Sequence, residues 1–136
     1  TSLIQVFPGI SGIILEASLE MGEDGSVNVV GMNRFETPVS NYSVLYRKFS
    51  ESGQALTGVV TLAGPGDDFT ILSSPVIAVD SSGITHLVHF DLNQLNNYMV
   101  DFVYTKFASN GSQIGDELVL SQLPPNKECA WQNTCA

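Results

Sequence analysis

The chain has 136 residues, 43% of them apolar and 14% charged, so it holds enough apolar side chains for one domain with a core. Asp and Glu outnumber Lys and Arg by 14 to 5, and the net charge of −9 excludes a general nucleic-acid binder, which needs a basic surface. The same charge argues against adhesion to anionic membranes, and no apolar run of about 18 residues suggests membrane insertion.

Two stretches of the chain match each other at a constant spacing of 58 residues. In chain order, residues 23–30 match 81–88, and Tyr-Arg-Lys-Phe at 46–49 matches Tyr-Thr-Lys-Phe at 104–107. Because two aligned blocks share one spacing, they predict a tandem repeat. The predicted organisation is a β domain over 1–122, with copies at about 1–58 and 59–116, and a tail with Pro and Cys at 123–136.

Each copy is predicted to form four antiparallel strands joined as a meander, so the expected fold class is all-β. In the second copy the strands are expected at residues 75–79, 84–90, 100–107 and 114–120. The intervening turns read Asp-Ser-Ser-Gly at 80–83 and Ala-Ser-Asn-Gly at 108–111. Such sequences favour tight reversals, because Asp, Asn and Ser bond to nearby backbone and Gly accepts a positive φ.

The repeated blocks resemble blades of β-propellers. Residues 75–88 are similar to the hydrophobic-Asp-x-x-Gly-x-x-hydrophobic hairpin of NHL-type blades and of the bacterial seven-bladed-propeller repeat. Residues 104–111 are similar to the aromatic-x-Lys-Phe strand and Gly-ended turn that follow in those families, and the first copy carries similar residues at 24–25 and 46–53. The resemblance implies propeller-blade-like sheets. Because propellers usually need at least four blades, it also implies a ring closed by oligomerisation; the alternative is a β-sandwich in which the two sheets pack face to face.

The two cysteines, Cys129 and Cys135, lie close together in the tail. A local disulfide, two free thiols and a metal site are the alternatives, and a tetrahedral metal site would need two further ligands. We expect the disulfide, which predicts an oxidising compartment and therefore a secreted protein, extracellular or at the cell surface.

Metal binding has weak support elsewhere in the sequence. His86 and His89 are three apart on a predicted strand, so they are expected on opposite faces and cannot chelate one ion together. Adjacent carboxylates in a loop make Asp67 and Asp68 the first choice if calcium binds, although Asp residues in turns usually cap the backbone. No cofactor is therefore expected, with calcium as the alternative.

A catalytic constellation is not found in the sequence. Gly-x-Ser-x-Gly does not occur, and the spacing of the Glu residues does not favour a carboxylate pair, so the chain is predicted not to be an enzyme. Sugar binding needs aromatic platforms beside polar amides. The candidates for such lectin-like sites are Tyr42, Tyr98, Asn41, Asn97 and Trp131. The alternative is that these aromatic side chains pack in the core or at strand ends.

Two functions follow from these observations. The first is a non-catalytic extracellular binding module, lectin-like, with glycans as partners and sites in the repeated loops. The second is a structural subunit of an extracellular filament, adhesin or surface assembly, with further copies of the chain as partners in a homo-oligomer or filament. Residues 2–7 and 117–122 are the expected end strands. Pairing of these strands within one chain would make assembly optional, whereas pairing between chains would favour the structural subunit.

Overall fold

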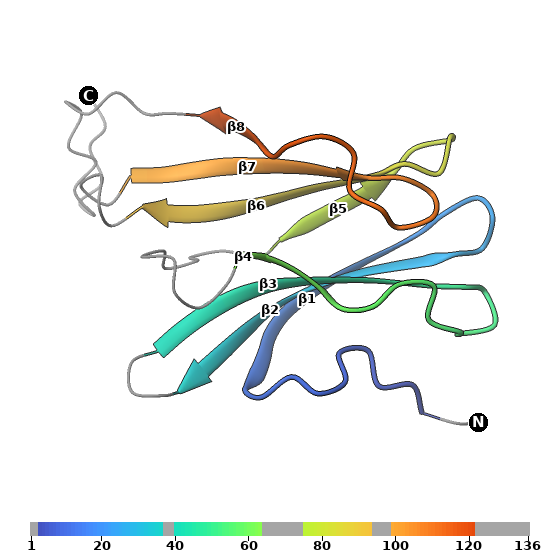
Figure 1. The fold of residues 1–136 in the computed structure, drawn as a ribbon, viewed down its shortest axis with the longest axis horizontal. Helices are drawn as coiled ribbons and strands as arrows, with labels where there is room; N and C mark the ends of the chain where they lie inside the picture. Colours follow the sequence, from blue (N-terminus) through green and yellow to red (C-terminus); the bar gives the residue numbers. More distant parts are fainter. Residues whose placement is uncertain (1–2, 37–39, 64–74, 94–98, 122–136) are drawn as a thin grey trace.

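The computed structural model describes residues 3–36, 40–63, 75–93 and 99–121, which form strands joined by turns and loops (Figure 1). The strands are β1 (Ile13–Met21), β2 (Val27–Glu36), β3 (Ser40–Phe49), β4 (Val60–Ala63), β5 (Val76–Val79), β6 (Thr85–Asn93), β7 (Met99–Phe107) and β8 (Leu118–Ser121). The predicted all-β class is confirmed.

The strands form two open four-stranded sheets, with the order β1-β2-β3-β4 in sheet 1 and β5-β6-β7-β8 in sheet 2. Each sheet is a meander, because strands that follow one another in the chain pair antiparallel. Figure 1 shows sheet 2 lying above sheet 1, with the first strands of the two sheets, β1 and β5, next to each other. The arrangement is consistent with blade-like and with sandwich-like packing.

The two sheets match in their hydrogen bonding at the spacing of 58 residues. Val27 pairs with Phe49 in sheet 1, and Thr85 pairs with Phe107 in sheet 2. The register shift between β3 and β4 recurs at the matching place between β7 and β8. We call two residues 58 positions apart counterparts, since they occupy the same place in the two sheets.

The turns between the long strands also correspond. Gly53 and its counterpart Gly111 both have a φ of 82°, a left-handed conformation that glycine adopts at little cost. The predicted turn at Asn110-Gly111 is thus confirmed, but the strand expected from residue 114 begins only at Leu118. Gly115, with a φ of 70°, interrupts the extended backbone just before that strand.

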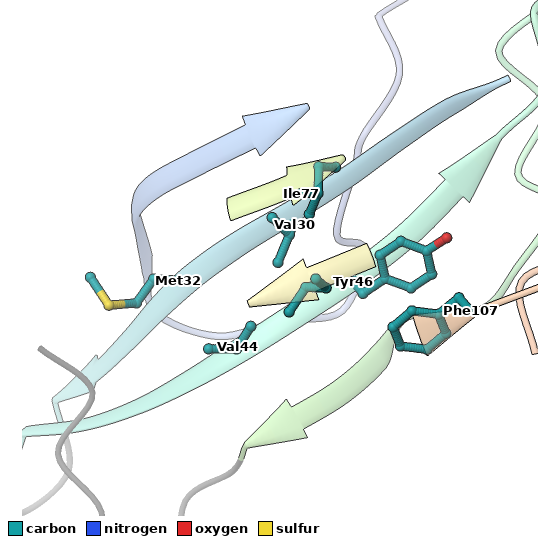
Figure 2. Packing of buried hydrophobic residues seen from close by; sticks show 7 residues of the cluster. Val30, Met32, Val44, Tyr46, Ile77 and Phe107 are labelled. Atoms are coloured by element: carbon teal, nitrogen blue, oxygen red, sulfur yellow. The ribbon is translucent and has the colours of Figure 1, made fainter. Parts of the chain in front are cut away.

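The core lies between the two sheets, as Figure 2 shows. Side chains alternate between the faces of a strand, so the even-numbered residues of β2 and β3 point toward sheet 2 and the odd-numbered residues of β6 and β7 point toward sheet 1. We call these the inner faces of the two sheets. The apolar residues that cluster there are Val30, Met32, Val44, Tyr46, Ile77, Leu87 and Phe107.

Polar side chains also join the inner faces. The buried amide oxygen of Asn28 accepts hydrogen bonds from the Tyr46 hydroxyl at 2.7 Å and from Oγ1 of Thr85, across the interface, at 2.9 Å. Nζ of Lys48, whose side chain is fully buried, donates to the backbone oxygen of Ser109 in sheet 2 at 2.7 Å. Because buried polar groups need partners, these bonds fix how the sheets are aligned.

Residues 3–12, here called the N-terminal segment, cover the outer face of sheet 1, the face turned away from sheet 2 (Figure 1). Nη1 of Arg47 donates to the backbone oxygens of Gln5 at 3.1 Å and Val6 at 2.7 Å. Phe7 is buried over Gly31, where an added Cβ would lie only 2.9 Å from its ring. The expectation of an end strand at 2–7 was therefore wrong for the described residues 3–7, whereas the end strand expected at 117–122 is confirmed as β8.

Candidate functional site

The face of sheet 2 that points away from sheet 1 is the candidate functional surface. Register and alternation place side chains of all four strands on it. This open face consists of Val76, Ala78, His86, Val88, Phe90, Phe102, Tyr104, Lys106, Leu118 and Leu120. Apart from His86 and Lys106, these side chains are apolar or aromatic.

Several apolar side chains of the open face are exposed to solvent. Val76 at one edge is 59% exposed, and Leu118 and Leu120 at the other edge are 56% and 54% exposed. Between them the rings of Phe90 and Phe102 pack at a centroid distance of 4.2 Å and a tilt of 58°. Folded chains that act alone rarely expose connected apolar patches of this kind, and such patches commonly mark interaction surfaces.

The open face is also the counterpart of the inner face of sheet 1. Tyr104 and Lys106 occupy the places that Tyr46 and Lys48 occupy in sheet 1. Sheet 2 buries both sheet 1 residues completely, while Tyr104 and Lys106 are only half-buried. The same residue pattern is thus an interface in one sheet and a solvent-facing surface in the other.

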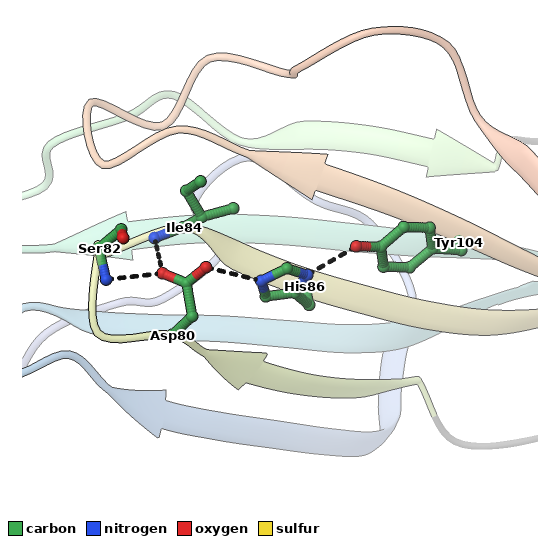
Figure 3. Close-up of polar contacts among 5 residues, drawn as sticks. All are labelled: Asp80, Ser82, Ile84, His86 and Tyr104. Carbon is green, nitrogen blue, oxygen red and sulfur yellow. Dashed lines mark hydrogen bonds and ion pairs between the residues drawn. The ribbon is translucent and has the colours of Figure 1, made fainter.

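A hydrogen-bonded network orders part of the open face, as Figure 3 shows. Oδ2 of Asp80 lies 3.1 Å from Nε2 of His86, and Nδ1 of His86 lies 2.6 Å from the Tyr104 hydroxyl. The other carboxylate oxygen of Asp80 accepts from the backbone N–H of Ser82 at 2.8 Å and of Ile84 at 3.0 Å. The turn between β5 and β6 therefore positions the carboxylate that holds the imidazole.

The charge of Asp80 makes its carboxylate the acceptor in each of its hydrogen bonds. The hydrogen bond from His86, followed by those from the backbone, lowers the pKa of Asp80 below its ordinary value of 3.8, so this carboxyl group is ionised at neutral pH. A carboxylate only accepts hydrogen bonds, so Nε2 of His86 is the donor to Asp80, while Nδ1 of the same ring is hydrogen-bonded to the Tyr104 hydroxyl. The network thus holds the imidazole of His86 and the phenol ring of Tyr104 in place.

In sheet 1 the corresponding residues make an equivalent contact. Asn28, the counterpart of His86, accepts a hydrogen bond from the Tyr46 hydroxyl, and His86 is hydrogen-bonded to the Tyr104 hydroxyl at the matching place. Burial raises the pKa of Tyr46 above its ordinary value of 10.0, because a phenolate between the sheets would lose its hydration. The tyrosine–acceptor pair is therefore part of the surface that one sheet uses to contact another.

The network was not predicted from the sequence. Asp80 was expected in a turn, which is confirmed, but the contacts that join Asp80, His86 and Tyr104 were not foreseen. The available signal was the recurrence of tyrosine at 46 and 104 beside a polar residue at 28 and 86. The prediction that His86 and His89 lie on opposite faces is confirmed, since His89 is fully buried on the inner face.

The predicted sugar-binding residues are not brought together by the described structure. Tyr42 is partly buried and packs against the core between the sheets, which agrees with the structural alternative for this residue. Asn41 lies in β3, but its side chain is outside the described part, as are Tyr98, Asn97 and Trp131 entirely. A lectin-like site therefore stays a prediction.

The predicted metal and disulfide residues also lie outside the described residues. These are Asp67 and Asp68 for calcium, and Cys129 and Cys135 for the disulfide, so both expectations stay predictions, as does the secreted location. Among the residues that are described, no group of three His, Cys, Asp or Glu side chains could hold a metal ion. Within the same ranges no helix is long and apolar enough to cross a membrane.

The chain was compared with family models, with curated proteins and with solved structures, and none of the three comparisons found a match. The function proposed below is therefore argued from the surfaces of the molecule.

Proposed function

We propose that this chain is an assembly module without a catalytic role, which binds another protein surface through the open face of sheet 2. The observation that carries the proposal is the apolar character of that face, with Val76, Leu118 and Leu120 each more than half exposed. Burying such side chains on association removes apolar surface from water, which is the main favourable contribution to most protein interfaces.

The relation between the sheets supports the same proposal. The inner face of sheet 1, which has the same pattern as the open face, is already an interface with a sheet. Its tyrosine stacks on an aromatic ring of sheet 2 and its lysine reaches a backbone oxygen there. A surface that keeps the tyrosine and the lysine in the same register, among apolar side chains, is suited to bind a sheet in the same way.

The test measures the mass of the full chain in solution by light scattering, from dilute to concentrated samples. We expect the mass to rise with concentration above the 14.6 kDa of one chain. Phe102→Glu places a charge in the middle of the open face, so it should hold the mass near 14.6 kDa. The matched control is Leu56→Glu, because Leu56 is also an exposed apolar residue but lies in the loop after β3, away from that face.

A mass of one chain at every concentration would count against the proposal. If Phe102→Glu then lowered the free energy of unfolding much more than Leu56→Glu, another part of the same chain would be covering the open face. If both variants assembled as the unmodified chain does, assembly would proceed through a different surface.

A further inference from the structure

We propose that the open face of sheet 2 binds the outer face of sheet 1 in a second copy of the chain, and that the N-terminal segment occupies this position until the second copy displaces it. The inference rests on the proposed function and names the partner and its surface. The contact inside the chain is the template: the inner face of sheet 1 packs on the inner face of sheet 2.

The outer face of sheet 1 is the counterpart of the inner face of sheet 2. Leu45 corresponds to Val103 and Phe49 to Phe107, so both faces present large apolar residues at these positions. On the inner face of sheet 2, Ile77 is 6% exposed because sheet 1 covers it, whereas its counterpart Leu19 on the outer face of sheet 1 is 66% exposed. The outer face therefore has apolar residues at the positions used by the inner face of sheet 2; Leu45 and Phe49 are covered within the chain, whereas Leu19 is uncovered.

The contacts inside the chain predict which residues would meet between copies. Tyr46 stacks on Phe107, so Tyr104 is expected on Phe49 of the second copy. Lys48 donates to the backbone oxygen of Ser109, whose counterpart is Glu51. Lys106 should therefore lie beside Glu51 of the second copy, where a cation meets an exposed carboxylate and opposite charges favour the contact.

The N-terminal segment blocks this contact in the described structure. Phe7 is buried on the outer face of sheet 1, and the segment is held there by Arg47, which donates to the oxygens of Gln5 and Val6, and by Asn33, which donates to that of Ser11 at 3.0 Å. A second copy that docks on this face must displace these residues. The segment therefore opposes assembly, and weakening it should promote assembly.

The first experiment uses light scattering on the full chain to test whether weakening the N-terminal segment promotes assembly. Phe7→Ala removes the buried ring and should lower the concentration of half-assembly by roughly tenfold or more. Gln5→Ala is the matched control, because it lies in the same segment, is exposed and keeps the backbone oxygen that Arg47 binds. If the segment had a purely structural role, Phe7→Ala would leave the concentration of half-assembly unchanged or raise it.

A second variant pair guards against misfolding of Phe7→Ala. Gly31→Ala adds a Cβ at 2.9 Å from the Phe7 ring and should push the segment outward, lowering the concentration of half-assembly in the same direction. Gly58→Ala is its control, because an added Cβ there meets no atom within 4 Å. If neither Phe7→Ala nor Gly31→Ala promotes assembly, the displacement of the segment is refuted.

The second experiment identifies the faces in contact. A zero-length carbodiimide joins amines to carboxylates that touch, and mixing isotope-labelled with unlabelled chain distinguishes links between copies by mass spectrometry. We expect a Lys106–Glu51 link between copies, which Lys106→Arg abolishes while assembly persists. Links from Lys106 to Asp80 of another copy would overturn the inference, because Asp80 holds His86 on the open face and such links would show two open faces packed on each other.

The outcomes also separate the inference from the proposed function. Chains that stay single with and without Phe7→Ala would refute both. If Phe102→Glu abolishes assembly but no Lys106–Glu51 link forms, the open face binds a surface other than the outer face of sheet 1. That result would refute the inference and leave the proposed function intact.

Discussion

Tyr46 of sheet 1 stacks on Phe107 of sheet 2, with ring centroids 4.3 Å apart and ring planes inclined by 16°. Both side chains are almost completely buried. The corresponding aromatic residues, Tyr104 and Phe49, lie instead on the open face of sheet 2 and the outer face of sheet 1. Tyr104 is only half-buried and Phe49 is covered within the chain, so the stacking of Tyr46 on Phe107 has no equivalent between their counterparts.

Phe107→Ala should lower the free energy of unfolding by about 3–5 kcal/mol, because it leaves a cavity between the sheets and removes the ring under Tyr46. Phe102→Ala removes the same atoms from the open face, where the ring is 38% exposed, and should cost about 1 kcal/mol or less. Urea unfolding at low protein concentration measures both. Equal costs would contradict the assignment of Phe107 to the interface between the sheets.

Tyr46→Phe should lower the free energy of unfolding by about 1 kcal/mol, since it deletes the buried hydrogen bond to Asn28 and keeps the ring. Tyr104→Phe deletes the corresponding bond to His86 at the half-buried surface and should cost about half as much or less. The same urea titrations give the comparison, and a larger cost for Tyr104→Phe would show that the two networks are not equivalent.

Gly111 and Gly115 both have a positive φ, 82° and 70°, but their surroundings differ, so alanine should have a different effect at each site. An alanine in this conformation costs about 1 kcal/mol, which is the loss expected for Gly115→Ala because its surroundings are empty. At Gly111 the added Cβ also collides with the Thr57 side chain of sheet 1, so a further loss of about 1–3 kcal/mol is expected. Thermal unfolding of the two variants measures the difference, and equal losses would mean that Thr57 moves aside freely.

Asp80→Asn should reduce stability at neutral pH and have less effect in acid. The folded state lowers the pKa of Asp80 below 3.8, chiefly through the hydrogen bond from His86, so its contribution is fully present above that pH. The contribution is lost as pH falls through the lower pKa of the folded state, because the carboxyl group is then protonated in both states. Denaturant unfolding of both proteins from neutral to strongly acidic pH checks this, and a difference that stays constant with pH would contradict it.

Much of the fold could be predicted from the sequence because its information is local and repeated. The alternating pattern of β6 and β7 and the turn at Asn110-Gly111 specify a meander, and the spacing of 58 residues shows that the pattern occurs twice. The start of β8 was misplaced because the residues from Ile114 are apolar enough for a strand, whereas Gly115 turns the backbone away.

The surfaces could not be predicted, because they depend on which faces of the strands meet. Phe7 is a residue type that is common in strands. Only its position over Gly31 in the structure shows that it packs on the outer face of sheet 1 instead. Likewise Asp80, His86 and Tyr104 are separated in the sequence and meet because β6 and β7 pair in one register. Single residues gave no sign of either contact.

The matching registers of the two sheets have a consequence for how such a chain can change in length. Each sheet completes its own hydrogen bonding between neighbouring strands, and the two sheets meet through one face of each. A third unit inserted between β4 and β5 would meet the same two kinds of surface that are already in contact there. Duplication of one unit would thus lengthen the stack of sheets without requiring a new kind of interface, and the number of units would set the size of the protein.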